Sequence, residues 1–200
     1  IYVYPNWIDT SLFKPSPFLK PPTPQYSRTL LFVGRLTHQK NLFSVVQSIS
    51  NTDFSLHIVG DGPLRADLRQ FAQRVNSNVV FLGNIANSLL PELMHSYQLF
   101  VFPSHYEGNP KALLEAMSCG LVVIANDSPG INTIVSHNTT GFLYDNTCSS
   151  FLDILSRLET SPKLALSISS KARQYILTNN SLDVLLKKEL SSYAYLSHEH

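Results

Sequence analysis

The chain alternates between short apolar runs and longer segments in which apolar residues recur every three or four positions. Short apolar runs that end near glycine are typical of buried strands, and the longer period is typical of amphipathic helices. The pattern predicts strands over 29–33, 54–59, 79–82, 98–103, 121–125 and 141–144. It predicts helices over 41–49, 63–75, 89–97, 110–119, 149–158, 162–178 and 181–196. We therefore predict an α/β fold with a buried parallel sheet flanked by helices, and further helices at the C-terminal end.

Proline divides the chain into three parts. Prolines at 5, 15, 17, 21, 22 and 24 interrupt regular structure, so residues 1–28 are expected to form an extended linker segment. Residues 29–178 are expected to form the main domain, and residues 179–200 a C-terminal helix and tail. The chain begins Ile-Tyr-Val-Tyr, without methionine, and we expect it to be a piece of a longer polypeptide.

The composition excludes several classes of protein. Formal net charge is +1 and charged residues make up 14% of the chain, so no global field favours nucleic acid. No apolar run reaches the ~18 residues that a membrane-spanning helix needs. The two cysteines, Cys119 and Cys148, are distant in sequence, which favours free thiols in a reducing compartment.

The loops after the predicted strands are the places to look for a site, because parallel α/β sheets bind ligands at the carboxyl ends of their strands. Gly34 follows the first strand and lets a ligand approach the backbone. Arg35 and Lys40 come next, just before a helix start near Asn41. Two cations beside a helix N-terminus suit a phosphate or diphosphate, although this loop taken alone slightly favours two ordinary solvated side chains.

The loops after the second and third strands are glycine-rich and less specific. Gly60 and Gly62 allow close contact, but the three spaced glycines of a dinucleotide site are absent, which disfavours a nicotinamide enzyme. Gly83, Asn84 and Ile85 follow the third strand, where the backbone offers a surface for a flat base. A plain connecting loop explains the same residues equally well.

The stretch HYEGNPKALLEAMSCG, residues 105–120, follows the fourth strand and carries two carboxylates, Glu107 and Glu115. Asn109 is expected to cap a helix that starts at Pro110, whose free amides would favour an anion. Glu115 shares a helix side with Lys111, and we expect that side to face the edge of a cleft. A ligand clamp and a surface glutamate paired with Lys111 remain equally good interpretations at this point.

No metal-binding pattern is present. The chain contains no Asp-x-Asp, His-Glu-x-x-His or Cys-x-x-Cys, and His198-Glu199-His200 is expected to be a frayed tail. We expect no cofactor and no metal. A diphosphate would then have to be neutralised by Arg35, Lys40 and helix amides.

Taken together, these stretches resemble the C-terminal, donor-binding domain of retaining glycosyltransferases of the GT-B fold, a large family that includes bacterial glycan and glycolipid transferases. The resemblance implies a Rossmann-like sheet that forms one half of the GT-B fold. With GFLYD, the stretches cover about residues 4–145 in the family's order. They are YPNWIDTSLFKP, LLFVGRLTHQKN, LHIVGDGPLRADL, VVFLGNI and LFVFPSHYEGNPKALLEAMSCGLVVIANDSPGI.

The resemblance implies a role for each candidate residue. Glu107 would be catalytic and face the donor sugar, and Glu115 would hold the ribose hydroxyls. The residues expected to bind the donor are Gly34, Arg35 and Lys40 at the diphosphate, Asn84 and Ile85 at the base, the amides of Gly108, Asn109 and Lys111, and Glu115. This chain departs from the family at Asn109-Pro110, where Phe-Gly is common, at Trp7, which replaces glycine, and at Thr133, which replaces an acidic residue.

The implied activity is transfer of a hexosyl group from a nucleotide sugar to a glycan or lipid-linked acceptor, with retention and without metal. An N-terminal acceptor-binding domain would precede this chain, and the helix over 181–196 would pack against it. The implied location is cytoplasmic, with peripheral contact at the inner face of the membrane as an option. The alternatives are a sugar-nucleotide epimerase of the same architecture and a non-catalytic nucleotide-sugar-binding domain. A glycoside hydrolase would need Glu107 and Glu115 about 5 Å apart.

Overall fold

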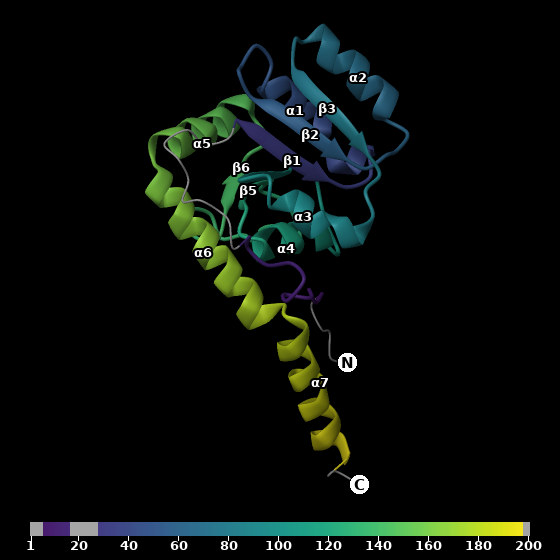
Figure 1. Cartoon of the computed structure of the whole chain (residues 1–200), viewed down its shortest axis with the longest axis vertical. Helices are drawn as coiled ribbons and strands as arrows, with labels where there is room; N and C mark the ends of the chain where they lie inside the picture. The colour runs from purple at the N-terminus through teal and green to yellow at the C-terminus, as the bar shows by residue number, and fades with distance from the viewer. Residues whose placement is uncertain (1–5, 17–27, 198–200) are drawn as a thin grey trace.

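The computed structural model describes residues 6–16 and 28–197. It contains a six-stranded, wholly parallel sheet in the order β3-β2-β1-β4-β5-β6 (Figure 1). The strands are β1 (Thr29–Val33), β2 (Ser55–Val59), β3 (Asn78–Gly83), β4 (Leu99–Phe102), β5 (Val122–Asn126) and β6 (Phe142–Tyr144). The predicted α/β fold is confirmed.

The helices cover both faces of the sheet. They are α1 (Leu42–Ser48), α2 (Arg65–Arg74), α3 (Leu90–Met94), α4 (Lys111–Ser118), α5 (Cys148–Thr160), α6 (Pro162–Asn179) and α7 (Leu182–Ser197), with 3-10 turns η1 (His38–Lys40) and η2 (Asn87–Leu89). Leu30 and Phe32 point to the face covered by α1, α2 and α5, and Leu31 points to the face covered by α3, α4 and α6. Because side chains alternate along a strand, one run of apolar residues supplies both cores.

Strand β3 lies at the edge of the sheet, which its sequence did not indicate. Val80 and Leu82 are 38% and 37% exposed, whereas every residue of β4 and β5 is buried. The apolar run Val79–Leu82 is therefore only half buried. An apolar run alone does not say whether a strand has a neighbour on each side.

The starts of α2 and α4 were each predicted one or two residues too early, and the predicted cap of α1 makes no side-chain cap hydrogen bond. Asn41 does not cap α1, because it adopts a left-handed backbone and its amide donates to the Asn146 side chain at 2.8 Å. Helix α2 begins at Arg65, after Pro63, and α4 begins at Lys111. Ser181 does act at the start of α7, where its Oγ accepts from the amide of Val184 at 3.4 Å.

Residues 6–16 pack onto the domain beside the start of α7. Ile8 and Phe13 are buried in the core under α3, α4 and α6, and Ile8 forms a parallel bridge with Ser181. Arg173 of α6 donates to the carbonyls of Thr10 and Phe13. The two ends of the domain are thus held together, and α7 extends from there away from the sheet (Figure 1). Residues 17–27 lie outside the described part, and boundaries at 28 and 178 remain predictions.

We expect Gly60→Ala to destabilise the domain by about 2 kcal/mol or more. Gly60 has a φ of +124°, and a Cβ there would lie 2.0 Å from the carbonyl oxygen of Gly34. Urea unfolding measures the loss. Gly108→Ala is the control, because a Cβ at Gly108 meets no atom within 4 Å. Equal unfolding free energies for the two variants would contradict the argument.

Candidate functional site

The carboxyl ends of β1, β2, β3 and β4 lie along one edge of the sheet, and their loops are bonded to one another. Gly34 donates to the carbonyl of Val59 at 3.0 Å, and Gly60 donates to that of Gly83 at 2.7 Å. Leu36 donates to the carbonyl of Asp61 at 3.0 Å. Glycine is required at this packing, since a Cβ at Gly62 would lie 2.5 Å from the Leu36 carbonyl oxygen. The edge is therefore a rigid backbone surface rather than a set of independent loops.

Lys40 and Glu107 form an ion pair at this edge. The Nζ of Lys40 lies 2.5 Å from Oε1 of Glu107, with the two side chains 18% and 5% exposed. The ammonium also lies over the ring of Phe102, 5.1 Å from its centroid. The sequence assigned these two side chains to different parts of a ligand and did not predict that they pair. The pair means that each charge is largely neutralised before any ligand binds.

Two neighbours that the sequence did not single out hold this pair in place. The backbone carbonyl of Gln39 accepts a hydrogen bond from the amide of His105 at 2.9 Å. The side-chain Nε2 of Gln39 donates to the carbonyl of Tyr106, also at 2.9 Å. The amide of Glu107 donates to the carbonyl of Pro129 at 3.0 Å. The Ser-Pro-Gly turn was a usable signal for the second contact, but nothing in the local pattern marks Gln39.

Glu115 is buried in α4, so the interpretation as a surface glutamate is wrong. The residue is 2% exposed, and its Oε1 lacks a hydrogen-bond partner within the described part of the chain. Lys111 Nζ lies 3.9 Å away, within reach as an ion pair but too far for a hydrogen bond. Burial raises the pKa of Glu115 to about 7, and Lys111 opposes this shift. A buried carboxylate without donors is costly, which favours a ligand that supplies them.

The turn before α4 differs from the predicted cap. Pro110 has φ −81° and ψ 59°, the geometry of an inverse γ-turn, and the amide of Lys111 donates to the carbonyl of Asn109 at 2.9 Å. The Lys111 amide is thus engaged within the chain, and the prediction that it faces a ligand is wrong for this conformation. Proline fixes φ and favours this turn. Gly108 and Asn109 are exposed beside it.

The other candidate residues lie along the same edge without forming one contact network. Arg35 is exposed, and its guanidinium has no ion-pair or hydrogen-bond partner among residues 6–16 and 28–197. A Cβ at Gly34 would lie 3.8 Å from Cε of Lys40, so these two are adjacent. Asn84 is exposed, whereas Ile85 is half-buried and packs against the core under α3 and α4.

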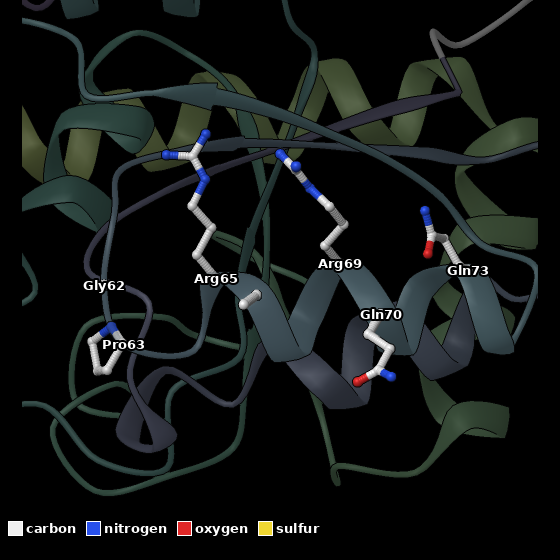
Figure 2. Close-up of a pocket in the computed structure, with 7 residues that line it drawn as sticks. Gly62, Pro63, Arg65, Arg69, Gln70 and Gln73 are labelled. Carbon is white, nitrogen blue, oxygen red and sulfur yellow. The ribbon is translucent and has the colours of Figure 1, made fainter.

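A separate hollow lies on the outer side of α2 and contains none of the predicted site residues. Figure 2 shows Arg65 and Arg69 extending from α2, with Gln70 and Gln73 farther along the helix. Both guanidinium groups lie over the ring of Phe81, at 5.9 and 5.4 Å from its centroid. Arg65 also pairs with Asp61, so these cations serve the packing of α2 on β3.

The described part of the chain has neither a metal-binding cluster nor a membrane-spanning helix. No group of three or more His, Cys, Asp or Glu side chains lies close enough there to hold a metal ion. No helix of that part is long and apolar enough to cross a bilayer. Cys119 is buried and Cys148 exposed, and both are free thiols, as predicted. His198-Glu199-His200 lies outside the described residues.

The structure is an α/β domain with a parallel sheet, and the loops at the carboxyl edge of that sheet carry Arg35 and the Lys40–Glu107 ion pair. The chain belongs to the group 1 glycosyltransferase family, described as "Glycosyl transferases group 1", which matches residues 18–175. The family supports the predicted class of enzyme and gives no support to a glycoside hydrolase.

Curated relatives agree with this family, and solved structures share the fold. A UDP-Gal:alpha-D-GlcNAc-diphosphoundecaprenol alpha-1,3-galactosyltransferase of Escherichia coli is 32% identical over 194 residues, 88% of this chain and 49% of that protein. Anabaena Alr3699/HepE in complex with UDP-glucose has a TM-score of 0.81 and 21% identity, over 97% of this chain and 57% of that one. The C-terminal domain of the group 1 glycosyl transferase LpcC from Francisella tularensis has a TM-score of 0.73 and 19% identity, over 88% of this chain and 99% of that one. The chain spans less than half the length of the first curated relatives.

Proposed function

We propose that this chain is the donor-binding, C-terminal half of a retaining GT-B glycosyltransferase. The enzyme would transfer a hexosyl group from a nucleoside diphosphate sugar to a glycan or lipid-linked acceptor. The observation that carries the proposal is the buried side chain of Glu115, whose Oε1 lacks a hydrogen-bond donor in the described part of the chain. Glu115 lies in α4, the helix that follows the loop carrying Glu107 of the Lys40–Glu107 pair. The ribose of a nucleotide has two adjacent hydroxyl groups, and these are the donors that such a carboxylate needs.

Each residue has a distinct part in the proposed reaction. Glu115 accepts the ribose hydroxyls, and the backbone at Asn84 and Ile85 lies beside the base. Arg35, Lys40 and the exposed amides of Gly108 and Asn109 neutralise the diphosphate, which makes it a better leaving group. Glu107 faces the sugar and stabilises positive charge that develops at the anomeric carbon. Neutralisation by cations and amides would make a metal ion unnecessary.

The rest of the enzyme is expected to precede this chain. The curated relatives are about twice as long, and the LpcC fragment of matching fold is a C-terminal domain, which supports this order. The preceding domain would bind the acceptor, and α7 would pack against it. Leu186 and Leu190 of α7 are 46% and 67% exposed, as such a contact would require.

We also propose a cytoplasmic location with peripheral contact at the inner face of the membrane. The E. coli relative is named for an acceptor carried on diphosphoundecaprenol, which supports a lipid-linked acceptor here. Titration of the full-length protein with UDP, GDP and ADP and their sugars, in the presence of EDTA, tests the proposal. Failure of every nucleotide to bind would overturn it, and product analysis separates a transferase from an epimerase or a non-catalytic domain.

We expect Arg35→Ala to weaken binding of the preferred nucleoside diphosphate about 10- to 100-fold, because one charge-assisted hydrogen bond is worth about 1.5–3 kcal/mol. Binding of the corresponding nucleoside, which has no phosphate, should change less than about threefold. Calorimetric titration measures both. Arg69→Ala is the matched control, since Arg69 is exposed on α2 and lies outside the proposed site. Equal losses for nucleoside and diphosphate would contradict the assigned role.

A further inference from the structure

A second hollow, of about 370 Å³, lies between the start of α4, the loop 130–134 and the junction of α6 with α7. We call it the α4–α6 hollow. Its size falls within the ~300–1,000 Å³ range of small-molecule sites. Gly108 and Pro110 line it, so it opens beside the loop that carries Glu107. Arg35, Lys40 and Glu115 are not among its lining residues, and Gly108 is the residue that it shares with the proposed diphosphate site.

The lining of the α4–α6 hollow is polar but almost uncharged. Amide and hydroxyl groups come from Asn6, Thr133, Tyr175, Asn179 and Asn180. No acidic residue is among its described lining residues, and Lys188 is the cation among them. Groups of this kind both donate and accept hydrogen bonds, which matches the hydroxyls of a sugar ring. A metal ion or an organic cation has no suitable partner there.

Tyr175 combines a fixed ring with an available hydroxyl. The ring is half-buried and packs against the core under α3, α4 and α6. Its hydroxyl has no hydrogen-bond partner in the part of the chain that the structure describes, and it is not buried away from solvent. An aromatic ring with a free polar end gives an adjoining ligand both an apolar surface and a hydrogen bond.

Asn180 supplies an independent observation. It is 4% exposed, and its Nδ2 donates to the carbonyl of Asn6 at 2.9 Å, which fixes the orientation of the side chain. Its Oδ1 is buried without a partner within residues 6–16 and 28–197, and the residue lines the hollow. An unsatisfied buried acceptor costs about 1–3 kcal/mol. A ligand hydroxyl in the hollow would satisfy it.

We propose that the α4–α6 hollow is a second carbohydrate subsite, which takes a neutral pyranose ring of the acceptor. The inference rests on the proposed function, because a transfer reaction needs a second substrate next to Glu107. The nucleotide and its sugar are proposed to bind at the sheet edge, and the hollow adjoins that edge through Gly108 and Pro110. This half of the enzyme therefore contributes to acceptor recognition, in addition to the preceding domain.

The test uses the full-length protein saturated with the nucleoside diphosphate that it binds. The probes are methyl α-D-glucopyranoside and methyl N-acetyl-α-D-glucosaminide, titrated by NMR. Binding of at least one probe is expected to persist with the nucleotide bound. Tyr175→Phe removes one hydroxyl and should weaken that binding about fivefold. Thr133→Phe places a bulky ring at an exposed position of the lining and should abolish it.

Gln174→Ala is the matched control, because Gln174 is exposed on α6 outside the hollow, and probe affinity should stay within about twofold. Nucleotide affinity should be unchanged in all three variants. Absence of probe binding to the nucleotide-saturated protein would overturn the inference. Displacement of the probe by the nucleotide sugar but not by the nucleotide would also overturn it, since the hollow would then belong to the donor. A different result would contradict the proposed function, namely absence of nucleotide binding by the unaltered protein.

Discussion

Glu115→Gln is expected to weaken nucleoside diphosphate binding about 10- to 100-fold at pH 8 and, at the same pH, to stabilise the free protein. The loss follows because glutamine replaces a charged acceptor of two ribose hydroxyls with a neutral one, at about 1.5–3 kcal/mol. The variant is expected to be more stable because the native free protein must bury an ionised carboxylate, whose Oε1 lacks a hydrogen-bond partner in the described structure.

The pH dependence gives the sign of the stability effect. Burial raises the pKa of Glu115 from its ordinary value of 4.5 to about 7. Between these values the folded protein binds more protons than the unfolded chain, so stability falls as pH rises through this window. The shift in pKa contributes about 3 kcal/mol to the free energy of unfolding. This contribution is fully present below pH 4.5 and is lost above pH 7. Glutamine does not titrate, and the variant should therefore gain relative to the native protein as pH rises.

Thermal or urea unfolding at pH 5 and pH 8 measures the change in stability. Calorimetric titration from pH 6 to pH 8 measures the change in binding affinity. Affinity of the native protein for the corresponding nucleoside, which has no titrating phosphate, should rise over that range as Glu115 ionises, and the rise should vanish in Glu115→Gln. Glu92→Gln is the control, because Glu92 is an exposed carboxylate on α3. A glutamine variant that binds nucleotide as tightly as the native protein at pH 8 would refute the assignment of Glu115 to the ribose.

Glu107→Gln is expected to reduce the transfer rate of the full-length enzyme about 10²- to 10³-fold, the usual effect of removing one electrostatic group at a reacting centre. Nucleoside diphosphate affinity should stay unchanged or increase. Lys40 is paired with Glu107 at 2.5 Å in the free protein, and glutamine releases its charge for the diphosphate. The two glutamate variants thus affect different steps: one lowers kcat, the other donor affinity.

Steady-state rates of transfer or donor hydrolysis, with the donor identified by titration, measure the effect on kcat. Calorimetry of the same variant measures nucleotide affinity, and Glu92→Gln again serves as the control. A normal kcat in Glu107→Gln would show that this carboxylate is not at the reacting centre. A loss of nucleotide binding as large as that in Glu115→Gln would show that Glu107 belongs to the nucleotide site.

The local pattern determined the elements of the fold. Short apolar runs identified the six strands, and helical periodicity identified the helices, because both signals depend on neighbouring residues. The shared carboxyl edge also followed, since parallel strands place their following loops together. The start of α4 was predicted one residue too early, at Pro110, and Asn41 makes no side-chain cap hydrogen bond to α1. Capping depends on backbone angles and on partners such as Asn146 that lie far away in sequence.

The site was determined by the sequence only as a set of residues, and the tertiary structure decided their states. Spacing put Glu107 and Glu115 near one helix start, but it left Glu115 equally compatible with a surface position. Packing of α4 against α6 and the sheet buried Glu115 and raised its pKa. The fold also brought Lys40 to Glu107 and formed the hollow beside Tyr175. Burial, charge pairing and cavities depend on contacts between distant segments, and those contacts exist only once the chain has folded.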